Sequence, residues 1–80
     1  MKIKLYGAAR CHKTQHYLQY FKEHNLDVEF LDVEQSEKSA EELRSLYTSG
    51  KLNFPTIMLD NKKLRNPSDD ELSKWINKLK

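Results

Sequence analysis

The sequence has a single cysteine, two glycines and two prolines among its 80 residues. A lone cysteine cannot form a disulfide within the chain, so the disulfide-stapled class of small secreted domains is excluded and a reducing, cytoplasmic setting is expected. The scarcity of glycine and proline excludes collagen-like and low-complexity chains. No apolar run is long enough for a signal peptide or a membrane-spanning helix, so we expect no leader and no membrane association.

An excess of one charge is also lacking. Fourteen Lys and Arg residues stand against twelve Asp and Glu residues, a formal net charge of +2. Nucleic-acid-binding domains usually carry a larger and clustered positive excess, so nucleic acid is not an expected partner. The hydrophobic fraction of 38% and the aromatic fraction of 10% are sufficient for one small core. The composition therefore predicts one globular domain over residues 1–80.

Hydrophobic periodicity predicts seven secondary-structure elements. Alternation of apolar residues indicates strands, and apolar spacings of three and four indicate helices. In the first half of the chain we expect a strand over 2–6, a helix over 11–25, a strand over 26–33, and a helix capped by Ser36 or Ser39 and closed by Gly50. In the second half we expect strands over 54–60 and 63–65, and a helix that begins with the capping pattern Ser68-Asp69-Asp70-Glu71.

The order β-α-β-α-β-β-α constrains the topology. A strand–helix–strand beginning implies a parallel pair of strands with a right-handed crossover. The tight turn expected at Asn61-Lys62 implies an antiparallel pair. An α/β fold with a mixed four-stranded sheet and helices on both faces satisfies both conditions.

Cys11 is the residue best suited to chemistry. It follows the first strand in a loop of small residues and stands where the first helix is predicted to begin. The positive end of a helix lowers the pKa of a thiol, and Arg10 and Lys13 add positive charge beside it. A lone cysteine is commonly a buried structural residue, but the charged neighbours favour an exposed, reactive thiol. Thr14, one turn later, can donate a hydrogen bond to the thiolate.

Pro55 is the second notable residue, because it opens an apolar strand. The statistics of X-Pro peptide bonds alone predict a trans bond. Three histidines raise a metal hypothesis, since His12 and His16 share a helix face. Cys11 and His12 are adjacent, which is awkward for one tetrahedral centre, so we expect no metal site.

Taken together, these features make the chain resemble glutaredoxin-type members of the thioredoxin-fold superfamily over almost its whole length. The matching features are a strand ending in Tyr6, Cys11 five residues later at a helix start, Phe54-Pro55-Thr56 opening the third strand, the turn Asp60-Asn61-Lys62-Lys63, and Asn66-Pro67-Ser68-Asp69 leading into the last helix.

The resemblance implies a set of roles. Cys11 would be the nucleophile, assisted by Thr14, Arg10 and Lys13, and no cofactor would be bound permanently. Glutathione would be a co-substrate, and the partner would be a disulfide-bonded or glutathionylated protein. The residues implied in substrate or glutathione binding are Tyr6, the backbone of Phe54, a cis Pro55, and Ser68 with Asp69 for the γ-glutamyl group.

Several positions depart from the family pattern. Cys-x-x-Cys becomes Cys11-His12-Lys13-Thr14, so no resolving cysteine is present, and the Cys-Gly-Phe-Ser of cluster-carrying members is absent. Ala8 stands where a lysine is common, and Asn66-Pro67 stands where a Gly-Gly pair is common. Arsenate-reductase-type proteins are a more distant resemblance, because they place an arginine where this chain has Gln15.

Three functions follow as hypotheses. The leading one is thiol–disulfide exchange or deglutathionylation through the single nucleophile Cys11, resolved by an external thiol. The alternative is a catalytically inactive thioredoxin-fold binding module that grips an extended peptide through Phe54 and Pro55. A metal or iron–sulfur carrier is the third.

Overall fold

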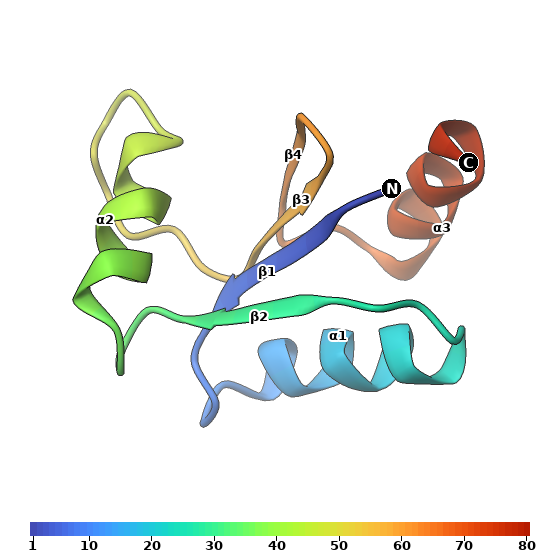
Figure 1. Ribbon diagram of the computed structural model, residues 1–80, viewed down its shortest axis with the longest axis horizontal. Helices are drawn as coiled ribbons and strands as arrows, with labels where there is room; N and C mark the ends of the chain where they lie inside the picture. The colour runs from blue at the N-terminus through green and yellow to red at the C-terminus, as the bar shows by residue number, and fades with distance from the viewer.

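The computed structural model describes residues 1–80 as a four-stranded sheet with three helices (Figure 1). The sheet order is β2-β1-β3-β4, with β1 and β2 parallel and the other two pairs antiparallel. The order of elements and the mixed sheet confirm the predicted fold. The elements are β1 (Ile3–Gly7), α1 (His12–Glu23), β2 (Glu29–Asp32), α2 (Glu37–Ser45), β3 (Thr56–Leu59), β4 (Lys62–Arg65) and α3 (Asp69–Leu79).

The main core lies between the sheet and the helices α1 and α3. Leu5 of β1 is paired with Phe30 of β2 and with Ile57 of β3, which in turn is paired with Leu64 of β4. Residues directly opposite one another in a sheet point to the same face, so this row is continuous. The core cluster consists of Ile3, Leu5, Tyr17, Tyr20, Phe21, Ile57, Leu59, Leu64, Leu72 and Ile76.

A smaller cluster covers the opposite face of the sheet. Tyr6, one residue along β1, points away from the main core and packs with Val33, Ala40 and Leu43 under α2. The helix α2 therefore lies on the face opposite α1 and α3, as the prediction of helices on both faces requires. None of the three helices is long and apolar enough to cross a membrane.

Helix ends follow local sequence signals where those signals are strong. The Ser68 hydroxyl accepts a hydrogen bond from the Glu71 N–H at 3.1 Å, which confirms the predicted cap of α3. Ser36, rather than Ser39, caps α2 through the Ser39 N–H. Asn25, the expected helix stop, adopts a left-handed conformation with φ 54° just after α1.

Several boundaries differ from the predictions. The helix α1 spans His12–Glu23 rather than 11–25, and the strand β3 spans Thr56–Leu59 rather than 54–60. The helix α2 ends at Ser45, so Gly50 (φ 68°) closes a following turn rather than the helix. The strand β2 begins at Glu29, which is the first residue of the segment to pair with β1, opposite Lys4. The β3–β4 turn is Asp60-Asn61, one residue earlier than expected, with φ 53° at Asp60.

Candidate active site

Three segments meet at the carboxyl end of β1. The register pairs Tyr6 with Thr56 and Thr56 with Arg65, so the start of β3 and the end of β4 lie beside the end of β1. The loop that carries Cys11 leaves the sheet at this end. The Asn66 N–H donates to the Pro55 carbonyl oxygen at 3.0 Å and ties the segment before α3 to the same place. The topology therefore gathers Cys11, Pro55 and the start of α3.

The Phe54–Pro55 peptide bond is cis. The trans bond that X-Pro statistics predict is therefore wrong at this position, and the cis bond implied by the family resemblance is present. The identity of the proline alone did not contain this information, because the same residue is compatible with both isomers.

Cys11 occupies the N-cap position of α1. Its backbone is extended, with ψ 124°, and its N–H donates to the Ala8 carbonyl oxygen at 2.9 Å. The Gln15 side-chain amide donates to the Ala9 carbonyl oxygen at 2.8 Å and fastens the loop to the first turn of α1. The thiol is partly exposed and makes no capping hydrogen bond. It is therefore placed at the positive end of a helix with access to solvent.

The surroundings favour the thiolate form of Cys11. Burial alone would raise the pKa of the thiol. The backbone N–H and hydroxyl of Thr14, the backbone N–H of Lys13 and the charge of Arg10 outweigh burial, so the pKa lies below its ordinary value. These are donors that a deprotonated sulfur can accept from and a neutral thiol uses poorly. Thr14 and Arg10 therefore act on Cys11 from nearby, whereas Lys13 acts through its backbone N–H and not through the side-chain charge that the sequence suggested.

Thr14 links the site to the sheet. Its side chain is fully buried, and its hydroxyl oxygen accepts a hydrogen bond from the Ala8 N–H at 3.3 Å. The hydroxyl proton remains free for the Cys11 sulfur, because a hydroxyl can accept and donate at once. The Thr14 hydroxyl therefore holds the loop at Ala8 and faces the Cys11 sulfur at the same time.

Replacing Thr14 by valine is expected to raise the pKa of Cys11, since the hydroxyl donor is lost while the volume is nearly kept. Alkylation of Cys11 by iodoacetamide near neutral pH should slow severalfold, because less thiolate is present. The buried Ala8 N–H loses its acceptor, so the free energy of unfolding should fall by about 1 kcal/mol. Thr14→Ser is the matched control and should keep the alkylation profile. An unchanged profile in Thr14→Val would contradict the assigned role of the hydroxyl.

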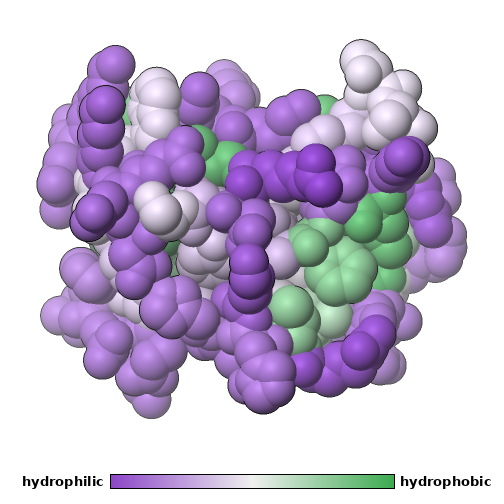
Figure 2. Space-filling view, turned by 180° about the vertical axis from the view of Figure 1, so that it is seen from behind, coloured by the Kyte–Doolittle hydropathy of each residue, from purple (hydrophilic) through white to green (hydrophobic).

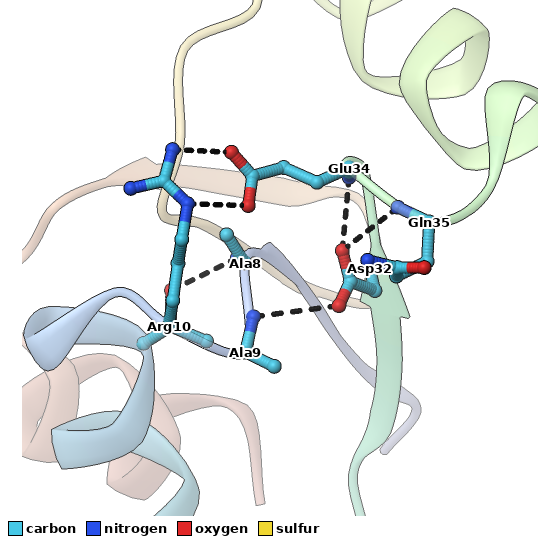
Figure 3. Close-up of polar contacts among 7 residues, drawn as sticks. Ala8, Ala9, Arg10, Asp32, Glu34 and Gln35 are labelled. Atoms are coloured by element: carbon cyan, nitrogen blue, oxygen red, sulfur yellow. Dashed lines mark hydrogen bonds and ion pairs between the residues drawn. The ribbon is translucent and has the colours of Figure 1, made fainter.

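A polar cluster fastens the Cys11 loop to the segment after β2 (Figure 3). The Arg10 guanidinium makes a two-pronged ion pair with the Glu34 carboxylate, at 2.9 and 2.6 Å. The Asp32 carboxylate accepts from the backbone N–H groups of Ala9, Glu34 and Gln35 at 3.4, 2.9 and 3.1 Å. Asp32 and Glu34 were missed by the sequence reasoning, and the only sequence signal was acidic residues at the end of a predicted strand.

The start of α3 is fastened to α1. Asp69 Oδ1 lies 2.8 Å from His16 Nε2, and the Tyr17 hydroxyl donates to the Pro67 carbonyl oxygen at 2.5 Å. Burial, followed by the charges of Asp69, Glu71 and Cys11, raises the pKa of Tyr17 to about 12, so it remains a neutral donor. The predicted glutathione-binding residues thus already have partners: the Ser68 hydroxyl caps the helix and Asp69 faces His16.

The remaining predicted site residues lie on the α2 side. Tyr6 is buried, and its hydroxyl donates to Glu42 at 3.2 Å. Burial and Glu42 together raise the pKa of Tyr6 to about 12. Phe54 is half-buried against the α2 cluster. No three His, Cys, Asp or Glu side chains come together in a way that could hold a metal ion.

Apolar surface gathers on one side of the molecule. Figure 2 shows green side chains grouped on the side where, in Figure 1, α2 and the segment after it lie. The half-buried residues Leu52 and Phe54 belong to this segment and precede Pro55 closely.

Comparisons with known proteins agree with this geometry. The family model named Glutaredoxin matches residues 3–64. A point mutant of the thioredoxin-like protein BC3987 is similar in structure, with TM-score 0.80 and 22% identity over 95% of this chain and 100% of that chain. The glutaredoxin from Archaeoglobus fulgidus has TM-score 0.78 and 18% identity over 94% of this chain and 85% of that chain. No curated protein matches the sequence.

Proposed function

Because the chain belongs to the glutaredoxin family, we propose that it exchanges thiols with disulfides through the single nucleophile Cys11. The observation that carries the proposal is the position of the sulfur. Cys11 is partly exposed at the start of α1, and the donors around it favour the thiolate. A thiolate is the form that attacks a disulfide.

The proposed reaction has two exchange steps and, for a glutathionylated substrate, needs one external thiol. The Cys11 thiolate attacks one sulfur of a substrate disulfide, forms a mixed disulfide with it and releases the other sulfur as a thiolate that takes up a proton. With one cysteine in the chain, the mixed disulfide cannot be resolved internally. For a glutathionylated protein, the sulfur held on Cys11 is that of glutathione. An external thiolate attacks this glutathione sulfur, releases the Cys11 thiolate and forms a disulfide with glutathione, so the protein substrate is reduced and the external thiol is oxidised. For a disulfide within a protein, the same step leaves the external thiol bonded to one substrate sulfur, and a second external thiol completes the reduction.

An extended protein segment is the proposed substrate. Neither the backbone N–H nor the carbonyl oxygen of Phe54 has a hydrogen-bond partner within the chain. Both groups are therefore available for strand-like pairing with a peptide, and Leu52 and Phe54 offer apolar contact beside them. This arrangement supports a disulfide-bonded or glutathionylated protein as the partner.

Glutathione is the proposed external thiol, and a reducing, cytoplasmic compartment is the proposed setting. A helix N-terminus such as that of α3 attracts carboxylate groups such as those of glutathione. Three acidic residues in the first turn of α3, Asp69, Asp70 and Glu71, oppose such a carboxylate. We therefore propose that glutathione acts as the resolving thiol and that it does not bind tightly at the start of α3.

Two measurements on the reduced protein test the proposal. Alkylation of Cys11 should rise with pH through a midpoint below that of an ordinary thiol, because the thiolate is favoured in the fold. Incubation with oxidised glutathione should add one glutathione per chain by mass spectrometry, and reduced glutathione should remove it. An ordinary midpoint with no adduct would refute the exchange reaction.

A second function is favoured by the open backbone of Phe54, which can hold a peptide without any chemistry at Cys11. Under this alternative the protein is a binding module of thioredoxin fold. Its distinguishing sign is peptide binding that is unaffected by oxidation or alkylation of Cys11.

A further inference from the structure

We propose that Glu34 restrains the reactivity of Cys11 by pairing with Arg10, the positive charge next to Cys11 in the chain. As regulation of the proposed reaction, this inference rests on the proposed function. Glu34 does not touch the reacting atoms and acts as a positioning residue. The observation behind the proposal is that Arg10, the charged neighbour of Cys11 in the chain, donates two of its guanidinium N–H groups to the carboxylate of Glu34 (Figure 3).

The geometry of the pair shows why Arg10 is held. Two parallel N–H donors of the guanidinium meet the two oxygens of one carboxylate, an arrangement that fixes direction as well as distance. The Arg10 side chain is 79% exposed and the Glu34 side chain 30% exposed, so Glu34 is the better anchored partner. Its backbone N–H is also held by Asp32 at 2.9 Å. Glu34 is therefore a fixed point that draws an exposed arginine toward the segment after β2.

The charges around the sulfur show how this affects the thiolate. Arg10 attracts the negative charge of Cys11 while it is paired with Glu34, so the Glu34 carboxylate and the Cys11 thiolate share one positive charge. On α1, the Lys13 backbone N–H faces the sulfur. The charge of Cys11, with those of Asp69 and Glu71 of α3, adds to burial in raising the pKa of Tyr17. From the end of β2, Asp32 reaches the loop at Ala9. Glu34 is the one of these acids that engages a positive group beside Cys11.

Freeing Arg10 is therefore expected to speed the reaction of Cys11. An exposed arginine next to Cys11 in the chain can turn toward the thiolate once its carboxylate partner is gone. The gain from one unpaired positive charge near the surface is modest, because water screens it. We expect Glu34→Gln to increase alkylation of Cys11 below neutral pH roughly two- to fivefold at low ionic strength. Added salt should reduce the gain.

The test measures the pH profile of Cys11 alkylation by iodoacetamide in four reduced proteins: wild type, Glu34→Gln, Arg10→Gln and the double variant. If Glu34 acts through Arg10, the acceleration by Glu34→Gln should fall by about half or more in the Arg10→Gln background. Equal acceleration in both backgrounds would overturn the proposal, because Glu34 would then act through its own charge alone. An unchanged or slower rate in Glu34→Gln would overturn it as well.

Glu37→Gln is the matched control. Glu37 is also an acidic residue paired with an arginine, Arg44, but the pair lies on α2. The same change of charge there should leave the alkylation profile of Cys11 unaltered. Thermal unfolding of each variant separates a loosened loop from an electrostatic effect, since loosening lowers the midpoint of unfolding and is not reversed by salt.

Alkylation by iodoacetamide distinguishes the restraint by Glu34 from the proposed exchange reaction, because it measures the reactivity of the thiolate and involves no disulfide. Altered alkylation in Glu34→Gln with no glutathione adduct in any variant would refute the proposed exchange reaction and leave the restraint by Glu34 standing. A normal adduct with identical alkylation profiles would refute the restraint and leave the exchange reaction standing.

Discussion

Replacing Cys11 by serine is expected to abolish thiol–disulfide exchange, at least about a thousandfold, down to the uncatalysed background. The reason is that the chain has no other thiol to attack a disulfide. The measurement is the rate at which the protein, with glutathione present, reduces a mixed disulfide between glutathione and a cysteine peptide.

The fold of this variant should be unaffected, which makes the loss interpretable. The Cys11 thiol is partly exposed and makes no capping hydrogen bond, and serine is a favoured residue at an N-cap. The unfolding midpoint should therefore be equal to or higher than that of the wild type. An exchange rate in Cys11→Ser above a tenth of the wild-type rate would contradict the proposed mechanism. Tight peptide binding in both proteins with no exchange in either would identify a binding module.

Replacing Gly7 by alanine is expected to have the second largest effect, on both stability and reactivity. A Cβ atom on Gly7 would lie 2.4 Å from Thr14 Oγ1 and 2.8 Å from Thr14 Cγ2. Gly7 is buried in β1 and Thr14 is fully buried, so neither side can move without repacking. We expect a loss of roughly 1–3 kcal/mol in the free energy of unfolding and slower alkylation of Cys11, since Thr14 is displaced from it.

A double-mutant cycle in urea tests the cause. Thr14→Ala removes the two closest atoms, so Gly7→Ala should cost less in that background than in the wild type. Gly50→Ala is the control, because Gly50 has a positive φ and a Cβ atom added to it would meet no other atom within 4 Å. It should lose about 1 kcal/mol from backbone strain and leave the reactivity of Cys11 unchanged. A Gly7→Ala variant as stable and reactive as the wild type would contradict the close contact.

Features set by neighbouring residues were predictable. The cap of α3 depends on Ser68 and Glu71, which are three positions apart, and it forms as predicted. The alternation near the N-terminus predicted a strand, and Ile3 and Leu5 of that strand lie in the main core, because alternate side chains of a strand point to the same face. The N-terminal end of α1 was placed within one residue, and with it the position of Cys11 at a helix start.

Features that depend on distant partners were not predictable. Arg10 pairs with Glu34, which is 24 residues away in the sequence, and His16 pairs with Asp69, which is 53 residues away. The length of β2 depends on where β1 offers a partner, so its own alternation overstated it. The placement of Tyr6 under α2 required knowledge of which face that helix covers.

The order of elements, the family pattern and the one thiol of the chain were therefore predictable, because they depend on periodicity, short-range capping and residue identity. The tertiary structure decided what surrounds that sulfur. Three contacts arise at the one end of the sheet where β1, β2 and β4 end and β3 begins: the buried Thr14 against Gly7, the pairing of Arg10 with Glu34, and the fastening of the segment before α3 to α1. Contacts of this kind are fixed by pairing and packing between remote segments, and no local pattern encodes them.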